Sequence, residues 1–225
     1  MAARGRLVVL EGAEGAGKTT LARRLAAHVD AAGVPHLAVR EPGGTAVGNE
    51  VRRIVLDEPH GDVTPRAEAL LFMASRAQLV EREIRPAIAA GKLVLADRFF
   101  LSTYAYQIHG RGLEPDLVRE ANRLATGGLV PDLTVLLRVP TAVGMTRIGA
   151  RGPADRIEQA DPGFHTRVAE AFDQFATPAW QRAHPECGPI TVVDAAPGPD
   201  AVFAAVLDLL ARHWPDAFAA RAGSR

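Results

Sequence analysis

Short apolar runs alternate along this chain with longer stretches in which apolar residues recur every three or four positions. The short runs are typical of strands that are buried on both faces, and the longer stretches are typical of helices with one apolar face. Five runs predict strands, at residues 6–11, 35–41, 92–96, 133–139 and 190–195. Because strands and helices alternate, we expect an α/β fold with a parallel sheet that helices cover on both faces.

Polar residues between the runs indicate where helices begin and end. Thr64-Pro65 and Asp161-Pro162 each place a capping side chain before a proline, which is typical of a first helical turn. Pro86 is expected to break or kink the helix that begins at Thr64. Further helices are expected at residues 21–32, 47–56, 116–125 and 202–210, with a short one after Pro140. No linker or repeat interrupts this order, so residues 1–225 are expected to form one domain with a frayed tail at 219–225.

Composition narrows the class of protein. The 225 residues are 48% hydrophobic and carry no formal net charge, which supports a sizeable core and argues against charge-driven binding to nucleic acid or to a membrane surface. No apolar run approaches the roughly 20 residues that span a bilayer. The single cysteine, Cys187, cannot form an internal disulfide. We therefore expect a cytoplasmic protein that binds neither nucleic acid nor membranes.

The first predicted strand leads into the most specific motif of the chain. Residues 12–19 match the phosphate-loop pattern G-x-x-x-x-G-K-[ST], with a strand before them and a helix after them. Glycines let the backbone approach a phosphate chain, and the amides of the following helix point at the anion. Lys18 supplies a positive charge and Thr19 suits magnesium. The alternative is a glycine-rich turn without a ligand, but one of only two lysines in the chain stands where the motif requires it.

Charged residues gather at the ends of other predicted strands. Asp97 follows the third strand and suits a water-mediated contact to magnesium beside the phosphate loop. Guanidinium groups suit phosphate oxygens, so the arginines near the loop favour a kinase that transfers a phosphoryl group between two nucleotides. Such an acceptor phosphate is already ionised and needs no general base. A GTPase is disfavoured because no Asn-Lys-x-Asp motif is present. The arginines concerned are Arg40, Arg52, Arg76, Arg98, Arg147, Arg151 and Arg156.

Four segments, in this order, resemble the thymidylate kinase family. They are Glu11–Thr20 (EGAEGAGKTT), Arg40–Thr45 (REPGGT), Asp97-Arg98 with Ser102–Gln107 (STYAYQ), and Asp155–Glu158 (DRIE), and the resemblance covers about residues 6–210. It implies a three-layer phosphate-loop NTPase fold with a five-stranded parallel sheet and a short arginine-rich lid at about residues 147–160. It also implies that a homodimer transfers the γ-phosphoryl group of MgATP to dTMP in line, as a step of dTTP biosynthesis, with Mg²⁺ as cofactor.

The resemblance implies roles for individual residues of the donor half. Lys18, Asp97 and Arg98 would be catalytic together with Arg151 and Arg156, because family members with an acidic loop residue take their catalytic arginines from the lid. Thr19 and Asp97 would hold magnesium, partly through water. The residues implied to bind ATP are Gly12, Ala13, Glu14, Gly15, Ala16, Gly17, Lys18, Thr19 and Thr20 in the loop, with Arg147 near the adenine.

The acceptor half is implied in the same way. Phe72 would stack on the thymine, Arg76 would hydrogen-bond it, and Tyr106 would crowd the sugar 2′ position. Arg52 and Arg98 would hold the dTMP phosphate, and the Glu41-Pro42 peptide would be cis. The residues implied to bind dTMP are Glu14, Glu41, Pro42, Arg52, Phe72, Arg76, Arg98, Ser102, Thr103, Tyr106 and Gln107.

One position departs from the family pattern. Arg138 stands where the fourth strand of the family commonly carries aspartate. This change either alters how the lid docks or leaves the arginine in solvent. Two other functions remain open at this stage: a kinase with a different nucleoside or nucleotide acceptor, and a nucleotide-binding regulator without catalysis, which Arg138 alone favours.

Overall fold

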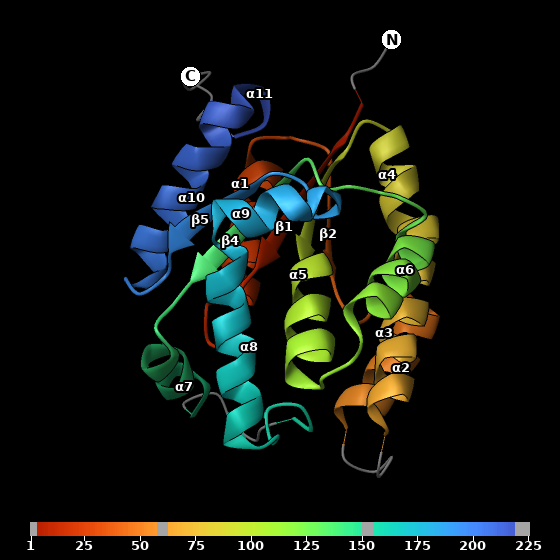
Figure 1. The fold of residues 1–225 in the computed structure, drawn as a ribbon. Helices are drawn as coiled ribbons and strands as arrows, with labels where there is room; N and C mark the ends of the chain where they lie inside the picture. The colour runs from red at the N-terminus through yellow and green to blue at the C-terminus, as the bar shows by residue number, and fades with distance from the viewer. Residues whose placement is uncertain (1–3, 58–62, 150–154, 219–225) are drawn as a thin grey trace, which may run out of the picture.

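The computed structural model describes residues 4–57, 63–149 and 155–218. The predicted tail at 219–225 and the middle of the predicted lid therefore lie outside the described residues. Five parallel strands form one sheet in the order β2-β3-β1-β4-β5 (Figure 1). Each strand begins and ends within one residue of its prediction. The strands are β1 Arg6–Glu11, β2 His36–Arg40, β3 Leu93–Asp97, β4 Leu133–Arg138 and β5 Ile190–Asp194.

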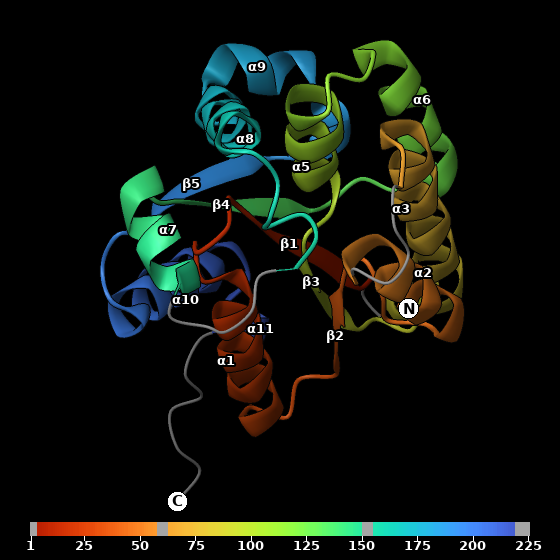
Figure 2. The ribbon, with the colours of Figure 1, turned by 90° about the horizontal axis from the view of Figure 1, so that it is seen from below.

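Helices cover both faces of the sheet, as predicted. Figure 2 shows α1, α10 and α11 on one face and the other large helices on the opposite face. The α-helices are α1 Lys18–Ala31, α2 Ala46–Leu56, α3 Pro65–Leu79, α4 Arg85–Ala89, α5 Phe100–Thr103, α6 Pro115–Thr126, α7 Thr141–Gly149, α8 Pro162–Phe175, α9 Pro178–Ala183, α10 Pro199–His213 and α11 Pro215–Phe218. Two π-helices, Val80–Ile84 and Tyr104–Gly110, and a 3₁₀ turn, Pro185–Cys187, complete them.

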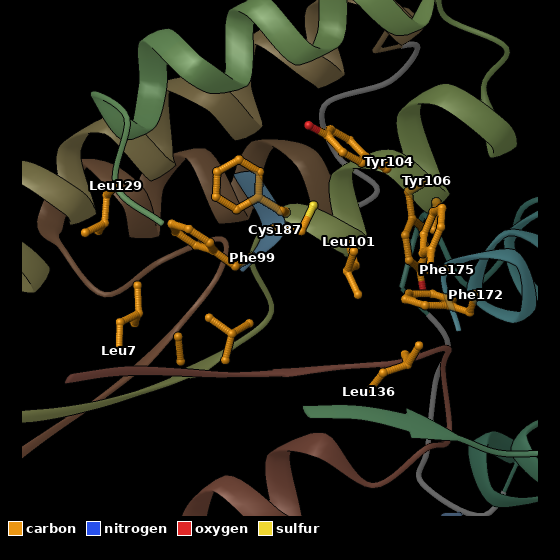
Figure 3. Close-up of a cluster of buried hydrophobic side chains, with 14 of the residues drawn as sticks. Leu7, Phe99, Leu101, Tyr104, Tyr106, Leu129, Leu136, Phe172, Phe175 and Cys187 are labelled. Carbon is orange, nitrogen blue, oxygen red and sulfur yellow. The ribbon is translucent and has the colours of Figure 1, made fainter. Parts of the chain in front are cut away.

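The alternation of side chains along β1 explains why both faces are covered. Leu7 and Val9 lie in one hydrophobic cluster, whereas Val8 and Leu10 lie in the other. Successive side chains of a strand point to opposite faces of the sheet, so a strand that is apolar throughout needs helices packed on both faces. The cluster on the face of α5 and α8 is rich in aromatic residues, among them Phe99, Tyr104, Phe172 and Phe175 (Figure 3).

The structure corrects one local prediction at a helix end and narrows another. Pro86 does not break its helix: α3 runs through the π-helix Val80–Ile84 into α4, and Pro86 lies in the first turn of α4. Of the expected break or kink, the break therefore does not occur; instead the α-helical hydrogen-bond pattern changes to the wider π pattern just before the proline. Thr64 precedes Pro65 as predicted, but its side chain makes no capping hydrogen bond. Asp161 does cap its helix and accepts from the Phe164 N–H at 3.0 Å.

The strand register brings the carboxyl ends of four strands to one edge. Asp97 at the end of β3 pairs in register with Arg40 of β2 on one side and with Leu10 of β1 on the other. Glu11 pairs with Leu136 of β4. The segments that follow these strands therefore meet at the same edge, which is where ligands bind in open α/β sheets.

Glu11 fastens the start of α5 to the end of β1. Its fully buried carboxylate accepts hydrogen bonds from the Phe99 N–H at 2.7 Å and from the Ser102 N–H at 3.1 Å. The Ser102 hydroxyl donates to the second oxygen at 2.7 Å. Between β3 and α5, Arg98 adopts a left-handed backbone conformation with φ of 76°, which is uncommon for a residue other than glycine. These bonds hold that turn in place.

Glu11→Ala is expected to lower the free energy of unfolding by about 3 kcal/mol or more, because two backbone N–H groups and a hydroxyl lose their acceptors inside the protein. Urea denaturation measures the change. Glu11→Gln, which keeps one acceptor oxygen, should lie between Ala and the native residue, and Glu50→Ala on the exposed side of α2 is the control. A loss below about 1 kcal/mol for Glu11→Ala would contradict this role.

Candidate active site

A cavity of about 620 Å³ opens where the strands end. Its walls come from the loop after β1, the residues that follow β2 and β3, helices α2 and α3, the π-helix Tyr104–Gly110, and the segments after β4 and β5. Most of the predicted site residues line it. They are Glu14, Gly15, Ala16, Gly17, Lys18, Thr19, Thr20, Glu41, Pro42, Arg52, Phe72, Arg76, Asp97, Arg98, Ser102, Thr103, Tyr106, Gln107 and Arg147.

Three of the predicted residues that the structure describes do not line the cavity. Gly12 and Ala13, at the start of the loop, accept hydrogen bonds from Lys18 through their carbonyls. Arg156 is held outside the cavity, and Arg151 lies outside the described residues. Arg40, predicted only as one of the arginines near the loop, also lines it, and so do Asp155 and Glu158, for which no individual role was predicted. They belong to the REPGGT and DRIE segments, so the signal for them was present in the sequence.

The loop after β1 packs tightly against α7. A Cβ atom at Gly15 would lie 2.2 Å from the carbonyl oxygen of Gly144, and one at Gly144 would lie 2.7 Å from the carbonyl oxygen of Glu14. Gly15 also has a φ of 73°, which favours glycine. Glycine at position 15 thus serves the turn and the contact between the loop and α7 at the same time.

Lys18 is buried at the centre of the loop. Its ammonium group donates to the carbonyls of Gly12 and Ala13, both at 2.8 Å. Burial, and then the nearby charge of Arg98, lower the pKa of Lys18 to about 7. A bound polyphosphate would reverse this effect, because an anion beside the amine favours its charged form.

Thr19 and Asp97 form an oxygen-rich corner next to Lys18. The Thr19 hydroxyl donates to one carboxylate oxygen of Asp97 at 2.6 Å. The other oxygen, Oδ1, is buried and accepts no hydrogen bond from the described residues. A buried carboxylate oxygen without a donor is costly, so this atom is suited to a ligand, water or cation that enters the cavity.

Glu14 connects the loop to the opposite wall of the cavity. The Tyr106 hydroxyl donates to Glu14 at 3.1 Å, and burial raises the pKa of Tyr106 above its usual range, so the hydroxyl keeps its proton. Arg98 lies with its guanidinium carbon 5.2 Å from the centre of the Tyr106 ring and donates to the Ser102 hydroxyl at 2.9 Å. Figure 3 shows Tyr106 beside Phe172 at the edge of the aromatic core. The core therefore positions the charged residues of the cavity.

Arg76 and Glu41 form a buried ion pair in the wall formed by α3. The Arg76 Nε donates to Glu41 at 2.7 Å, and one Nη donates to the same carboxylate oxygen at 2.5 Å. Its remaining N–H groups donate to the Thr103 hydroxyl and the Phe99 carbonyl, both at 2.8 Å, and to the Asn122 side chain. Burial raises the pKa of Glu41, and Arg76 opposes that rise. All five guanidinium donors are thereby occupied, so a contact from Arg76 to a base stays a prediction. The Glu41-Pro42 peptide is cis, as predicted.

Arginines concentrate positive charge between the two walls. Arg40, Arg52 and Arg98 line the cavity together, and burial followed by the charge of Arg40 lowers the pKa of Arg52. Three cations in one cavity repel one another and favour an anion with several negative charges. The cavity is thus suited to phosphate groups on the side away from the loop as well.

Two further arginines differ in their position: Arg147 lines the cavity, and Arg138 does not. Arg147 donates to the carbonyls of Ala195 at 2.8 Å and Ala196 at 2.9 Å, and so joins α7 to the segment after β5. Arg138 is exposed and pairs with Asp173 of α8 at 2.7 Å, away from the cavity lining. Of the two alternatives left open by the sequence, the structure therefore favours a solvent-exposed arginine.

Comparison with known proteins gives consistent results. The family model described as thymidylate kinase matches residues 10–185. A thymidylate kinase of Deinococcus radiodurans is 49% identical over 178 residues, which cover 79% of this chain and 86% of the relative. One of Carboxydothermus hydrogenoformans is 45% identical over 173 residues, covering 77% and 85% of the two chains. One of Thermosynechococcus vestitus is 42% identical over 228 residues, covering 93% and 88%.

Binding of a nucleoside triphosphate at pH 8 is expected to take up close to one proton, because free Lys18, with a pKa of about 7, is mostly neutral at that pH and becomes charged beside the phosphates. For the same reason affinity should fall as the pH rises above 7. Calorimetric titration with MgATP in buffers of different ionisation enthalpy measures the uptake. Lys18→Arg, whose guanidinium is always charged, should bind without it. Uptake near zero in the native protein would show that Lys18 is already charged.

Proposed function

Because the chain belongs to the thymidylate kinase family, we infer that it phosphorylates dTMP to dTDP with ATP as the phosphoryl donor. It is an ATP-dependent transferase of nucleotide biosynthesis. One observation of the structure carries this function: a single cavity joins a complete phosphate loop to a second wall that holds an aromatic side chain and further arginines. A donor and an acceptor that enter from the two sides would meet between Lys18, Asp97 and Arg98. We further propose that residues 1–225 work as one domain.

On the donor side, we propose that the loop amides and Lys18 hold the terminal phosphates of ATP. The transition state of phosphoryl transfer is loose, so correct placement and the compensation of charge supply most of the rate. Lys18 already lies between the loop carbonyls and the cavity, and Thr20 lines the same wall. Arg147 would flank the adenine, because it fixes the segment after β5 that closes this end of the cavity.

On the acceptor side, we propose that Arg52 and Arg98, with Arg40, hold the dTMP phosphate. This phosphate is mostly a dianion at neutral pH, so it can attack in line without a base. Phe72 would stack on the thymine, while Ser102, Thr103 and Gln107 border the base. Tyr106 would favour deoxyribose by crowding the 2′ position.

Mg²⁺ is proposed as the cofactor, and the donor set fits it. Thr19 and Asp97 offer hard oxygen ligands, and Asp97 Oδ1 has no hydrogen-bond donor among the described residues. Within those residues no group of three or more His, Cys, Asp or Glu side chains forms a metal site, which suits a cation that keeps waters and binds mainly to the substrate phosphates. Bound magnesium would offset negative charge on the β- and γ-phosphates.

We also propose a homodimer that forms through α2, α3 and α6. These helices lie side by side (Figure 1), and they expose Val47, Leu70, Leu117 and Leu124. Leu117 and Leu124 are seven positions apart and so lie on the same face of α6, and the exposed fraction of Leu124 is 83%, which is high for a large apolar side chain. No described helix is long and apolar enough to cross a membrane. Because the only cysteine, Cys187, is a free thiol, we place the enzyme in the cytoplasm.

The native protein is expected to release ADP from MgATP with dTMP much faster than with dUMP, dCMP, dAMP, dGMP or thymidine. Lys18→Ala should lower kcat by at least about a hundredfold while the circular dichroism spectrum stays native, because the charge that faces the transferred phosphoryl group is lost. A steady-state coupled assay measures both results. A preference for another acceptor would overturn the assignment, and near-native turnover by Lys18→Ala would remove this residue from catalysis.

Leu124→Glu is expected to convert a dimer into a monomer of 23.9 kDa, because an unpaired charge would be buried in the proposed interface. Analytical ultracentrifugation measures the mass. Met145→Glu, which places the same charge on an exposed apolar position of α7, is the matched control and should remain dimeric. A native protein that sediments as a monomer at micromolar concentration would exclude this interface.

A further inference from the structure

A buried carboxylate outside the cavity has no part in the function described so far. Glu68, in the first turn of α3, is fully buried. It accepts hydrogen bonds from Arg111 at 3.0 and 2.9 Å, from Gln107 at 3.2 Å, and from Arg156. Burial disfavours its charge, but the hydrogen bonds of the two arginines outweigh burial and lower the pKa of Glu68. Glu68 is therefore an ionised group that joins three segments of the chain.

Arg156 is tied to a second element as well. Its Nε donates to the Val55 carbonyl at 2.8 Å, and its backbone N–H donates to the Leu56 carbonyl at 3.0 Å. These carbonyls belong to the last turn of α2, where carbonyls lack partners within the helix and carry the negative end of its dipole. A cation that donates to them caps the helix. Arg156 thus joins the end of α2 to the start of α3.

The neighbours of Arg156 form part of the cavity wall. Asp155, Ile157 and Glu158 line the cavity. The Asp155 side chain accepts from the N–H groups of Ile157 and Glu158, both at 2.9 Å, and Ile157 is buried in the aromatic core. This turn is internally bonded; Ile157 packs it on the core, the His165 ring bonds to the Glu158 carbonyl at 3.1 Å, and Arg156 ties it to α2 and α3.

Glu68 reaches two other parts of the same wall. Gln107, which it holds directly, lines the cavity from the π-helix. Phe72 lies four residues after Glu68 in α3 and is therefore on the same face of that helix. One carboxylate is thus bonded to Gln107 and, through Arg156, to the turn that carries Ile157, and it lies on the helix that carries Phe72; we call these three lining segments the acceptor wall.

We propose that Glu68 and Arg156 are positioning residues that together build the acceptor wall, and that Arg156 acts on the reaction through this wall and makes no contact with the transferred phosphoryl group. This inference rests on the proposed function of the cavity. It assigns Arg156 a role different from the catalytic one that the family resemblance implies. The basis is geometric: the Nε of Arg156 bonds to the end of α2, one Nη bonds to the buried Glu68, and Arg156 is not among the residues that line the cavity.

The two roles predict different kinetics. If Arg156 positions the wall, Arg156→Gln raises the KM for dTMP about tenfold, changes kcat less, and leaves the KM for ATP unchanged. If Arg156 contacts the phosphoryl group, the same variant lowers kcat by a hundredfold or more with little change in the KM for dTMP. Arg156→Lys distinguishes the two roles further, because it should restore activity only if Arg156 contacts the phosphoryl group. A point charge can restore a phosphate contact, whereas only the planar fork can join Glu68 to the Val55 carbonyl.

The kinetic constants of Glu68→Gln distinguish the two roles. A positioning partner gives the same rise in the KM for dTMP as Arg156→Gln, and the double variant is no worse than either single variant. If Glu68 only restrains a catalytic arginine, its neutralisation leaves kcat and KM unchanged or raises kcat. Arg212→Gln, which breaks the exposed pair with Asp208 on α10, is the matched control and should behave like the native enzyme.

Hydrogen exchange tests the anchor without any turnover. In Arg156→Gln and Glu68→Gln, the amides of Ile157 and Glu158 should exchange at least about tenfold faster than in the native protein, whereas those of β1 stay unchanged. Unchanged exchange, or a loss confined to kcat in Arg156→Gln, overturns the proposal. Absence of dTMP turnover by the native protein and by Arg212→Gln would instead refute the proposed function. If Glu68→Gln does not fold, the two Arg156 variants decide the question.

Discussion

Every central strand of the sheet is buried on both faces, so charged side chains have no place along the strands and gather where the strands end. Glu11, Asp97 and Lys18 are all nearly inaccessible to solvent, yet they lie within one small region at the carboxyl edge. Such charges are tolerated only with partners. Glu11 is satisfied by the start of α5 and Lys18 by the loop carbonyls, while Asp97 keeps one oxygen without a donor among the described residues. The architecture thus places a buried carboxylate oxygen without a donor among the described residues at the edge where the cavity opens.

The same edge explains how two nucleotides could share one cavity. The phosphate loop and the cis Glu41-Pro42 turn follow neighbouring parts of the sheet, and the left-handed turn at Arg98 lies between them. The walls are also linked by side chains, since Tyr106 connects the aromatic core to Glu14 of the loop. Positioning matters most for phosphoryl transfer, where little covalent chemistry is required of the protein. A rigid frame around a highly charged cavity suits that requirement.

The sequence predicted the features that depend on local patterns. All five strands follow from short, mainly apolar runs, and the loop of residues 12–19 follows from its glycines and Lys18. Features that depend on contacts between distant segments could not be predicted in this way. Glu68 and Arg156 are 88 positions apart, and nothing near either residue indicates that they pair. The local sequence could not decide between a break and a kink at Pro86, because the π-helix before it lets the helix continue. Arg138 was ambiguous because its partner, Asp173, lies 35 positions away on α8.

The close approach of the phosphate loop and α7 has a consequence for engineering the protein. A side chain at Gly15 would collide with the backbone of Gly144, and a side chain at Gly144 would collide with the backbone carbonyl of Glu14. Backbone cannot move aside as a flexible side chain can. The two positions therefore behave as one unit in any redesign: enlarging either residue requires the facing segment to be rebuilt, and neither can be optimised by itself.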